Sequence, residues 1–291
     1  MAYFEYRPHS TLYHYCSAAS FDGITANGSI WLSDLQHAND PKELQLSAVI
    51  DGVISELIRD APSASVRITY ARMKTEMKRL AGRFGLYSFS LSLTSDRLPM
   101  WQEYTDRGRG YIIGFRPSSF SDMPVRVQRV KYVQPNYFGT LHSDIASIIA
   151  PLAGKAWNFL QSVEPVAQLL SLITATKDDT WRHEDEVRLI FSNLTDTNDK
   201  ETRSLPIAMR KDGSSIYSRP PLLRKRDGTD IPYYSMEFGR YRTARWDASG
   251  AIAQVIVGPN NPCTIEEVED NLREKGYHGV SVQKSRCAFR P

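Results

Sequence analysis

The sequence predicts an α+β fold with a mixed, mostly antiparallel sheet and inserted helices. Three observations carry this prediction. Short apolar or alternating segments typical of strands recur along the whole chain. Two longer stretches with helical spacing interrupt them, at about 41–82 and 141–176. No internal repeat or low-complexity tract divides the chain, so we expect a single domain over 1–291 with two helical insertions.

The bulk composition is that of an ordinary soluble globular protein. The 291 residues are 41% hydrophobic and 24% charged, and the formal net charge is +3. That charge is too small to indicate a nucleic-acid partner by itself. No apolar stretch approaches the roughly 18 residues of a membrane span, and the first residues do not have the pattern of a signal peptide. We therefore expect no membrane partner.

The chain lacks the common signatures of metal and nucleotide sites. Its cysteines, Cys16, Cys263 and Cys287, form no C-x-x-C pair, so we expect no metal, no disulfide framework and a cytoplasmic location. No Walker A loop, G-x-G-x-x-G or H-E-x-x-H is present. These absences count against a P-loop enzyme, a dinucleotide-binding Rossmann domain and a zincin. No cluster with metal-ligand spacing favours a nuclease or phosphodiesterase.

Strands and short helices alternate at the start of the chain. Residues 12–17 predict a strand, and the helix that follows over 18–27 should end at Gly28. Residues 30–33 predict a second strand. The run 39–43 has the pattern of a helix start with a capping box, so the first helical insertion should begin there.

Further strands precede and follow the second helical insertion. Residues 86–93 alternate strictly, and 110–115 and 125–133 also predict strands. The stretch 141–175 is helical, and 186–191 predicts another strand. Two prolines should break the helical stretch into pieces: Pro151 and Pro165.

The last third of the chain combines irregular and regular segments. An irregular basic segment at about 195–245 should form loops or hairpins. A strand–helix–strand unit then closes the chain, at 253–257, 264–275 and 279–282.

His14 is flanked by Tyr13 and Tyr15 on the first predicted strand, with Ser17 just beyond it. At a strand end, a histidine can donate a hydrogen bond to a ribose hydroxyl. The alternative is a histidine whose ring is satisfied by backbone carbonyls of the sheet.

Glu184 and Glu186 lie two residues apart, so a strand would point both carboxylates to one face. Two neighbouring carboxylates raise each other's pKa or need a cation, which Arg188 on the same face can supply. A glutamate there can stabilise an oxocarbenium-like centre or orient the nucleophile that attacks it. The alternative is a solvated strand face with cross-strand ion pairs.

Trp101 and Tyr104 lie three residues apart, on one face of a helix. Aromatic rings at a loop edge can stack on a nicotinamide or a nucleobase, but this spacing is also typical of core residues.

Ser88, Ser90 and Ser92 share one face of their strand. Such serines can line a ligand cleft or simply allow close packing, and no G-x-S-x-G surrounds them.

Asn39 precedes a sufficient helix cap, in which Asp40 is the N-cap and Glu43 completes the capping box. Because the box does not need the Asn39 side chain, a substrate-facing role for it stays open.

Basic residues are dense at 219–226 and again at Arg240, Arg242 and Arg245. They form either a solvated loop or a grip on phosphates or single-stranded nucleic acid.

Taken in order, these segments resemble a broad prokaryotic family known mainly as a domain of unknown function. Its pattern is Leu-Tyr-His/Lys-Tyr, Trp-Leu-Ser, Asn-Asp-Pro-x-Glu, a serine-rich strand, Trp-x-x-Tyr before Gly-x-x-Ile-Gly-Phe, and Trp-x-x-Glu-x-Glu-x-Arg-Leu. The chain has these motifs at 12–15, 31–33, 39–43, 88–92, 101–115 and 181–189. The match covers nearly the whole chain.

A second, more distant resemblance is to ADP-ribosyltransferases. Tyr-His-Tyr-x-Ser, followed by Ile-x-x-x-Gly-x-Ile-Trp-Leu-Ser, looks like their first motif and spans 13–33 here. Glu186 begins a strand, as the glutamate of their last motif does. The resemblance implies a sheet of the ADP-ribosyltransferase type. It also implies that His14 holds the nicotinamide ribose, Glu186 supports the developing cation and Glu184 orients the acceptor.

The same resemblance implies NAD as the substrate. Nicotinamide would leave through an oxocarbenium-like state that is stabilised electrostatically. The acceptor would be a protein side chain, a nucleic acid or water, and the role that of a toxin or phage-defence effector. The alternative is a non-catalytic nucleotide- or nucleic-acid-binding protein. The residues expected to bind NAD are Tyr15, Ser17, Ser33, Asn39, Ser90, Trp101, Tyr104 and Arg188.

Overall fold

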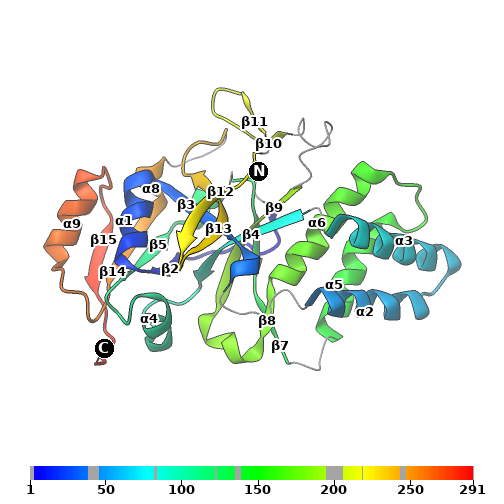
Figure 1. Ribbon diagram of the computed structural model, residues 1–291, viewed down its shortest axis with the longest axis horizontal. Coiled ribbons are helices and arrows are strands. Elements are labelled where there is room, and N and C mark those ends of the chain that lie inside the picture. The colour runs from blue at the N-terminus through cyan, green and yellow to red at the C-terminus, as the bar shows by residue number, and fades with distance from the viewer. Residues whose placement is uncertain are drawn as a thin grey trace.

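The computed structural model describes residues 3–38, 46–81, 84–121, 123–134, 139–194, 206–217, 219–242 and 247–290. The predicted α+β class is confirmed. Within these residues, eleven strands form one mixed sheet in which most neighbours are antiparallel. Helices pack at both ends of the sheet (Figure 1).

Strand β4 (Phe84–Ser92) lies at the centre of the sheet. Along its whole length it pairs antiparallel with β9 (Glu186–Leu194). Beyond β9 the sheet continues through β6 (Arg126–Arg129) to β1 (Tyr3–Phe4). These strands form the undivided part of the sheet.

The sheet forks at the other edge of β4, which two strands share. Strand β3 (Ser29–Asp34) pairs with the first half of β4, at Tyr87 and Ser88. Strand β2 (Leu12–Cys16) pairs with its last residue, Ser92. No strand of the described residues pairs with the edge of β4 between these positions. The two branches continue as β5 (Tyr111–Phe115), β14 (Ile252–Val257) and β15 (Ser281–Lys284) beyond β2, and as β13 (Thr229–Glu237) and β12 (Leu222–Arg226) beyond β3.

Helix α1 (Ala18–Asn27) connects the two branches at the fork. The Ser17 hydroxyl caps its first turn by accepting a hydrogen bond from Ser20 N. Gly28 ends it with φ +57°, and a Cβ there would lie 2.6 Å from the side chain of Ala248. The predicted helix over 18–27 is therefore confirmed, because both of its ends are encoded locally.

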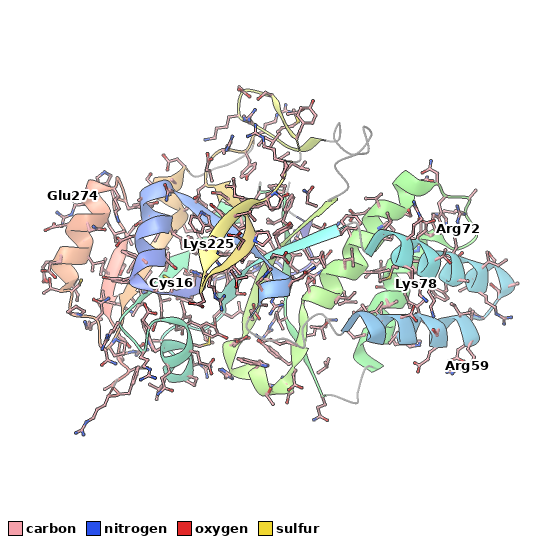
Figure 2. The ribbon with its side chains drawn as sticks, viewed as in Figure 1. Cys16, Arg59, Arg72, Lys78, Lys225 and Glu274 are labelled. Atoms are coloured by element: carbon pink, nitrogen blue, oxygen red, sulfur yellow. The ribbon has the colours of Figure 1, made fainter. Side chains whose placement is uncertain are left out.

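The two predicted helical insertions pack against each other beside the sheet (Figure 1). They consist of α2 (Leu46–Arg59), α3 (Ala64–Ala81), α5 (Gly139–Ile149) and α6 (Phe159–Thr174). Their apolar faces form a separate core that includes Met73, Leu80 and Ile145. Charged side chains such as Arg59 and Lys78 lie on the outer surface of this unit (Figure 2).

Two sequence predictions about these elements were wrong. Pro165 lies inside α6 and does not break it. Burial of Val166, Leu169 and Ile173 on the apolar face of α6 outweighs the proline penalty of about 3 kcal/mol. The expected single strand over 125–133 is split, because β6 pairs with β9 whereas β7 (Lys131–Val133) pairs with β8 (Thr176–Asp178).

The remaining elements are short. Strands β10 (Pro206–Met209) and β11 (Ser215–Tyr217) form a separate hairpin within the predicted basic segment. Helix α9 (Ile265–Glu274) has the predicted capping box of Thr264 and Glu267 and connects the parallel strands β14 and β15. The others are α4 (Leu98–Tyr104), α8 (Ala248–Ala251), η1 (Leu35–His37), η3 (Pro117–Phe120), η4 (Ala150–Leu152) and η5 (Asp179–Glu184).

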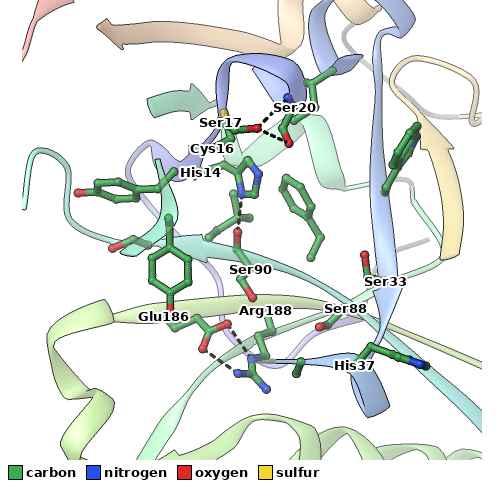
Figure 3. Close-up of a pocket in the computed structure, with 18 of the residues that line it drawn as sticks. His14, Cys16, Ser17, Ser20, Ser33, His37, Ser88, Ser90, Glu186 and Arg188 are labelled. Atoms are coloured by element: carbon green, nitrogen blue, oxygen red, sulfur yellow. Dashed lines mark hydrogen bonds and ion pairs between the residues drawn. The ribbon is translucent and has the colours of Figure 1, made fainter. Parts of the chain in front are cut away.

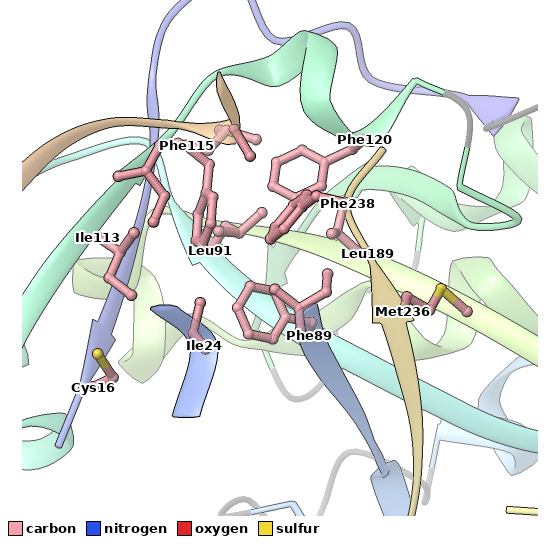
Figure 4. Packing of buried hydrophobic residues seen from close by; sticks show 14 of the residues in the cluster. Cys16, Ile24, Phe89, Leu91, Ile113, Phe115, Phe120, Leu189, Met236 and Phe238 are labelled. Carbon is pink, nitrogen blue, oxygen red and sulfur yellow. The ribbon is translucent and has the colours of Figure 1, made fainter. Parts of the chain in front are cut away.

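An aromatic cluster holds the two branches of the sheet together. Phe115 of β5 packs against Phe89 of β4, with ring centroids 6.2 Å apart, and against Phe238 just after β13, at 5.4 Å (Figure 4). Phe120 contacts the rings of Phe115 and Phe238. Because this cluster joins β4 to both branches, it fixes the opening of the fork.

Candidate functional site

A cavity of about 620 Å³ lies at the fork of the sheet. Its walls come from β2 and the start of α1, from β3 with β12 and β13, and from β4 and β9 (Figure 3). Its size falls in the range of small-molecule sites. Residues 88–92 of β4, which include the edge between its two strand partners, all line the cavity.

Most of the residues that the sequence singled out line this cavity, although they are distant in the chain. The fork explains this, because it brings β2, β3, β4 and β9 together at one place. The lining residues among them are His14, Tyr15, Ser17, Ser33, Ser88, Ser90, Ser92, Tyr104, Glu184, Glu186 and Arg188.

Trp101 does not belong to the cavity, so the prediction that it stacks on nicotinamide was wrong. Its side chain is fully buried, and its Nε1 donates a hydrogen bond to Asp96 Oδ1 at 2.8 Å. Its ring packs edge-on against Tyr15. The alternative interpretation of Trp101 as a core residue holds. The prediction for Asn39 lies outside the described residues, as does the helix start expected over 39–43.

His14 faces the cavity from β2 and stacks on Phe89, with ring centroids 4.2 Å apart. Its Nδ1 lies 2.9 Å from the carbonyl oxygen of Ser90, on the unpaired edge of β4. Because a carbonyl only accepts, Nδ1 carries a proton, and in the neutral ring Nε2 is an acceptor. Dense protein surroundings lower the pKa of His14 to about 4. In a neutral His14, Nε2 is therefore available as an acceptor, whereas the sequence predicted a donor.

Glu186 and Arg188 form a buried ion pair on one face of β9, as their two-residue spacing predicts. Arg188 Nε lies 2.8 Å from Glu186 Oε1, and Arg188 Nη2 lies 2.9 Å from Glu186 Oε2 (Figure 3). The Glu186 backbone N–H donates to the hydroxyl of Tyr132. Burial by itself would raise the pKa of Glu186, but the adjacent guanidinium of Arg188 lowers it overall. Glu186 is thus held ionised and in a fixed orientation.

Glu184 reaches the same region by a different route from the one predicted. It ends the short helix η5, and β9 begins only at Glu186, because Asp185 between them adopts a left-handed conformation with φ +44°. The two glutamates therefore do not share a strand face. Tyr104 at the end of α4 donates a hydrogen bond to Glu184 Oε1. Burial, and then the charge of Glu186, raise the pKa of Glu184.

Lys177 is the functional candidate that the sequence reasoning missed. Its ammonium lies 2.7 Å from Glu184 Oε2 and 3.8 Å from Glu186 Oε2, and the side chain is almost fully buried. It also lies over the ring of Trp181, 4.4 Å from the centroid. A lone lysine at the end of an apolar helical stretch gives almost no sequence signal of this role. Its nearness to Trp181 in the chain was the one available indication.

Two arginines of the predicted basic segment, Arg224 and Arg226, line the cavity from β12. Arg240 forms an ion pair with Glu237 at 2.6 Å and Arg242 contacts the sulfur of Met209, both away from the cavity lining. Arg245 lies outside the described residues. The basic segment therefore contributes to the site through β12.

No three side chains of His, Cys, Asp or Glu in the described ranges gather as metal ligands. Within the same ranges, no helix has the length and apolar character needed to cross a membrane.

Comparison with known proteins shows a family model that matches part of the chain. The model of a family described as "Protein of unknown function (DUF2971)" matches residues 100–189, the segment that supplies Tyr104, Lys177, Glu184, Glu186 and Arg188. No curated protein and no solved structure matches the chain, so neither comparison connects it to ADP-ribosyltransferases. Residues 100–189 of this chain are a DUF2971 domain of unknown function.

Proposed function

We propose that the cavity binds NAD, cleaves the bond between nicotinamide and ribose, and passes the ADP-ribosyl group to an acceptor or to water. One observation carries the proposal: His14, Tyr104, Glu184 and Glu186 converge on one cavity at the fork of the sheet. His14, Glu184 and Glu186 are the residues to which the resemblance assigns roles. The sheet that joins β2 to β9 through β4 is consistent with the ADP-ribosyltransferase type, which belongs to the same proposal.

The chemistry needs a fixed negative charge in a site of low dielectric constant. As the glycosidic bond breaks, nicotinamide takes the electron pair and positive charge develops on the ribose. An ionised carboxylate held in place before the reaction stabilises that charge without reorganising. Glu186 has this character, because Arg188 and Lys177 keep it ionised and oriented.

Acceptance of a proton from the attacking group is the second requirement. Glu184 suits this role, because its pKa is raised and it contacts both Tyr104 and Lys177. His14 would hold the substrate, with Nε2 accepting a hydrogen bond from a ribose hydroxyl. These assignments separate binding by His14 from charge stabilisation by Glu186.

The test uses NAD labelled separately in the nicotinamide and in the adenylate phosphate. Purified protein should release labelled nicotinamide, and Glu186→Gln should not, although it remains folded by circular dichroism. Adding cell lysate separates the two forms of the reaction. Phosphate label that becomes attached to a macromolecule indicates transfer, whereas free ADP-ribose indicates hydrolysis.

The proposal fails if the wild-type protein neither releases nicotinamide nor binds NAD, with or without lysate. A toxin or phage-defence role would require a further result. Expression of the wild-type protein should then arrest cell growth, and expression of Glu186→Gln should not.

A second function, nucleotide or nucleic-acid binding without catalysis, is favoured by Arg224 and Arg226 on the cavity wall. It predicts binding of NAD or of single-stranded nucleic acid without release of nicotinamide. For nucleic acid, the affinity should fall steeply with salt concentration and on neutralisation of Arg224 and Arg226.

A further inference from the structure

One wall of the cavity is made by the branch of β3, β13 and β12. Trp31 and Ser33 of β3, and Arg224 and Arg226 of β12, all line the cavity. The antiparallel register explains why they share a face, since they alternate along their strands with residues that point the other way. This wall is basic and aromatic, whereas the glutamates come from η5 (Glu184) and β9 (Glu186).

Arg224 is half-buried and differs from the two buried cations of the cavity, Arg188 and Lys177. Its Nη2 donates to Ser33 Oγ at 3.0 Å, and its guanidinium lies 5.8 Å from the centroid of the Trp31 ring. Among the described residues, its Nε is buried without a hydrogen-bond partner, and no carboxylate pairs with the side chain. Arg188 and Lys177, by contrast, are neutralised by Glu186 and Glu184.

A second unpartnered atom lies at the same wall. His37 ends the short helix η1 directly after β3 and lines the cavity, and its Nδ1 is buried without a hydrogen-bond partner among the described residues. Native proteins leave few buried polar atoms unpaired. The two unpaired atoms together indicate a site that is completed by a ligand with anionic oxygens.

We propose that this wall is a phosphate subsite, in which Arg224, Ser33 and His37 bind the pyrophosphate of a nucleotide. The planar donors of a guanidinium match phosphate oxygens, and hydrogen bonds between charged groups are the stronger kind. Trp31 and Tyr233, with ring centroids 4.6 Å apart, give an aromatic surface beside it. The inference rests on the proposed function in taking the ligand to be a nucleotide, and it assigns the β12–β13 hairpin to recognition of the phosphates.

The test measures binding without turnover, by calorimetric titration with ADP-ribose and with adenosine, which lacks phosphate. Arg224→Gln is compared with Lys225→Gln, which removes the same charge from the next residue of the strand. Lys225 is 73% exposed, pairs with Asp230 and is absent from the cavity lining (Figure 2). Arg224→Gln should weaken ADP-ribose about ten-fold or more, as expected for the loss of a charged hydrogen bond, and leave adenosine unchanged. Lys225→Gln should leave both affinities unchanged.

Several outcomes would overturn the inference. One is an equal loss of affinity for ADP-ribose and for adenosine in Arg224→Gln, which would mean that Arg224 only shapes the wall. Another is equal weakening by Arg224→Gln and Lys225→Gln, which would mean diffuse electrostatics. A third is no binding of ADP-ribose by the wild-type protein at millimolar concentration. A fourth is a lower affinity of Arg224→Gln for a short single-stranded oligonucleotide, with its affinity for ADP-ribose unchanged.

Failure of this inference and failure of the proposed function can be told apart. Binding of ADP-ribose that depends on Arg224, without release of nicotinamide from NAD, leaves the subsite in place and removes the catalytic proposal. Release of nicotinamide that depends on Glu186, with no effect of Arg224→Gln on ADP-ribose, does the reverse. Arg224→Lys keeps the charge and loses the planar donors, so its affinity for ADP-ribose should lie between those of wild type and Arg224→Gln. Such partial recovery would show that the loss in Arg224→Gln is not due to misfolding.

Discussion

Lys177 lies between two carboxylates that would otherwise repel each other. It contacts Glu184 and Glu186, and Arg188 contacts Glu186 from the other side. All four side chains are at most 6% exposed. Such a network is stable only while its charges remain matched, because removing one partner leaves an uncompensated buried charge.

Lys177→Met should therefore lower the free energy of unfolding by about 3–5 kcal/mol, the range for breaking a buried ion pair. Combining it with Glu184→Gln should recover part of this loss, because the second change removes the stranded carboxylate. Urea denaturation of the single and double variants measures both effects. A loss below about 1 kcal/mol for Lys177→Met would show that the network is not coupled in this way.

His14 gives a prediction of pH dependence. Its pKa is about 4 in the folded protein and about 6.5 in the unfolded chain, so between these values only the unfolded chain binds the proton. Its contribution to stability is complete above pH 6.5 and is lost as the pH falls toward 4. Between about pH 7.5 and pH 5, the free energy of unfolding of wild type should fall by about 1–2 kcal/mol more than that of His14→Gln, as urea denaturation at the two pH values would measure. The solvent in the open cavity keeps this difference small. Equal losses in the two proteins would contradict the assigned neutral state.

Residue types and short spacings in the sequence predicted part of the site. The two-residue spacing of Glu186 and Arg188 predicted their ion pair, because both lie on one strand. Lys177 could not be found in this way, since its contacts with Glu186 depend on where β8 and η5 lie in the fold. Trp101 was misjudged because aromatic spacing identifies a helix face without telling whether that face is buried or lines a cavity.

At the scale of elements, helix α4 places Tyr104 at the cavity. Asp96, just before this helix, holds α4 in position through a hydrogen bond with Trp101. Asp96 Oδ1 accepts from Trp101 Nε1 at 2.8 Å, and Oδ2 accepts from the backbone N–H of Arg286 at 2.8 Å. Ser285 also donates to Asp96. Asp96 thus joins α4 to the segment after β15, with its own backbone at φ +58°.

Asp96→Ala should destabilise the protein by about 2–3 kcal/mol, because it leaves the Nε1 of the buried Trp101 without its acceptor and places alanine in a left-handed conformation. Asp96→Asn should cost less, about 1 kcal/mol, since asparagine keeps one acceptor oxygen and tolerates that conformation. Chemical denaturation compares the two variants. Equal losses would mean that these hydrogen bonds do not hold α4.

The existence of elements was predictable where local signals mark them. Both ends of α1 are encoded, by Ser17 and Gly28, and the capping box of α9 by Thr264 and Glu267. The division of 125–133 between two sheets was not predictable, because it depends on different partners, β9 and β8, that lie far along the chain.

At the scale of the whole molecule, the helical unit and the forked sheet have separate apolar clusters. Leu80 is fully buried in the helical unit, and Leu32 is fully buried behind the cavity wall, between Trp31 and Ser33. The cluster of the helical unit shares no residue with the cavity lining. Stability and ligand binding should therefore be separable.

Leu80→Ala and Leu32→Ala should each lower the free energy of unfolding by about 3 kcal/mol, as expected for cavities in a packed core. Leu80→Ala should leave the affinity for ADP-ribose unchanged, whereas Leu32→Ala should weaken it because its strand carries part of the wall. Denaturation and calorimetric titration of both variants measure these effects. Equal weakening of ADP-ribose by the two variants would show that the helical unit and the cavity are coupled.

The sequence predicted the class of the whole molecule but not the fork that makes its site. A mixed sheet with inserted helices follows from local periodicity, and the structure has both. The fork depends on β2 and β3 sharing one edge of β4, at Ser92 and Ser88, and no local pattern encodes that choice. It is nevertheless the feature that gathers His14, Glu186 and Arg224 around one cavity.

The most direct test of the central claim is the rate of nicotinamide release from NAD by wild type, Glu186→Gln and Glu164→Gln. Glu164 is the matched control, because its carboxylate pairs with Arg126 and lies outside the cavity lining. The account predicts release by wild type and Glu164→Gln, and a loss of about 100-fold or more in Glu186→Gln. Equal rates for all three proteins, or no release by the wild type even with lysate, would contradict it.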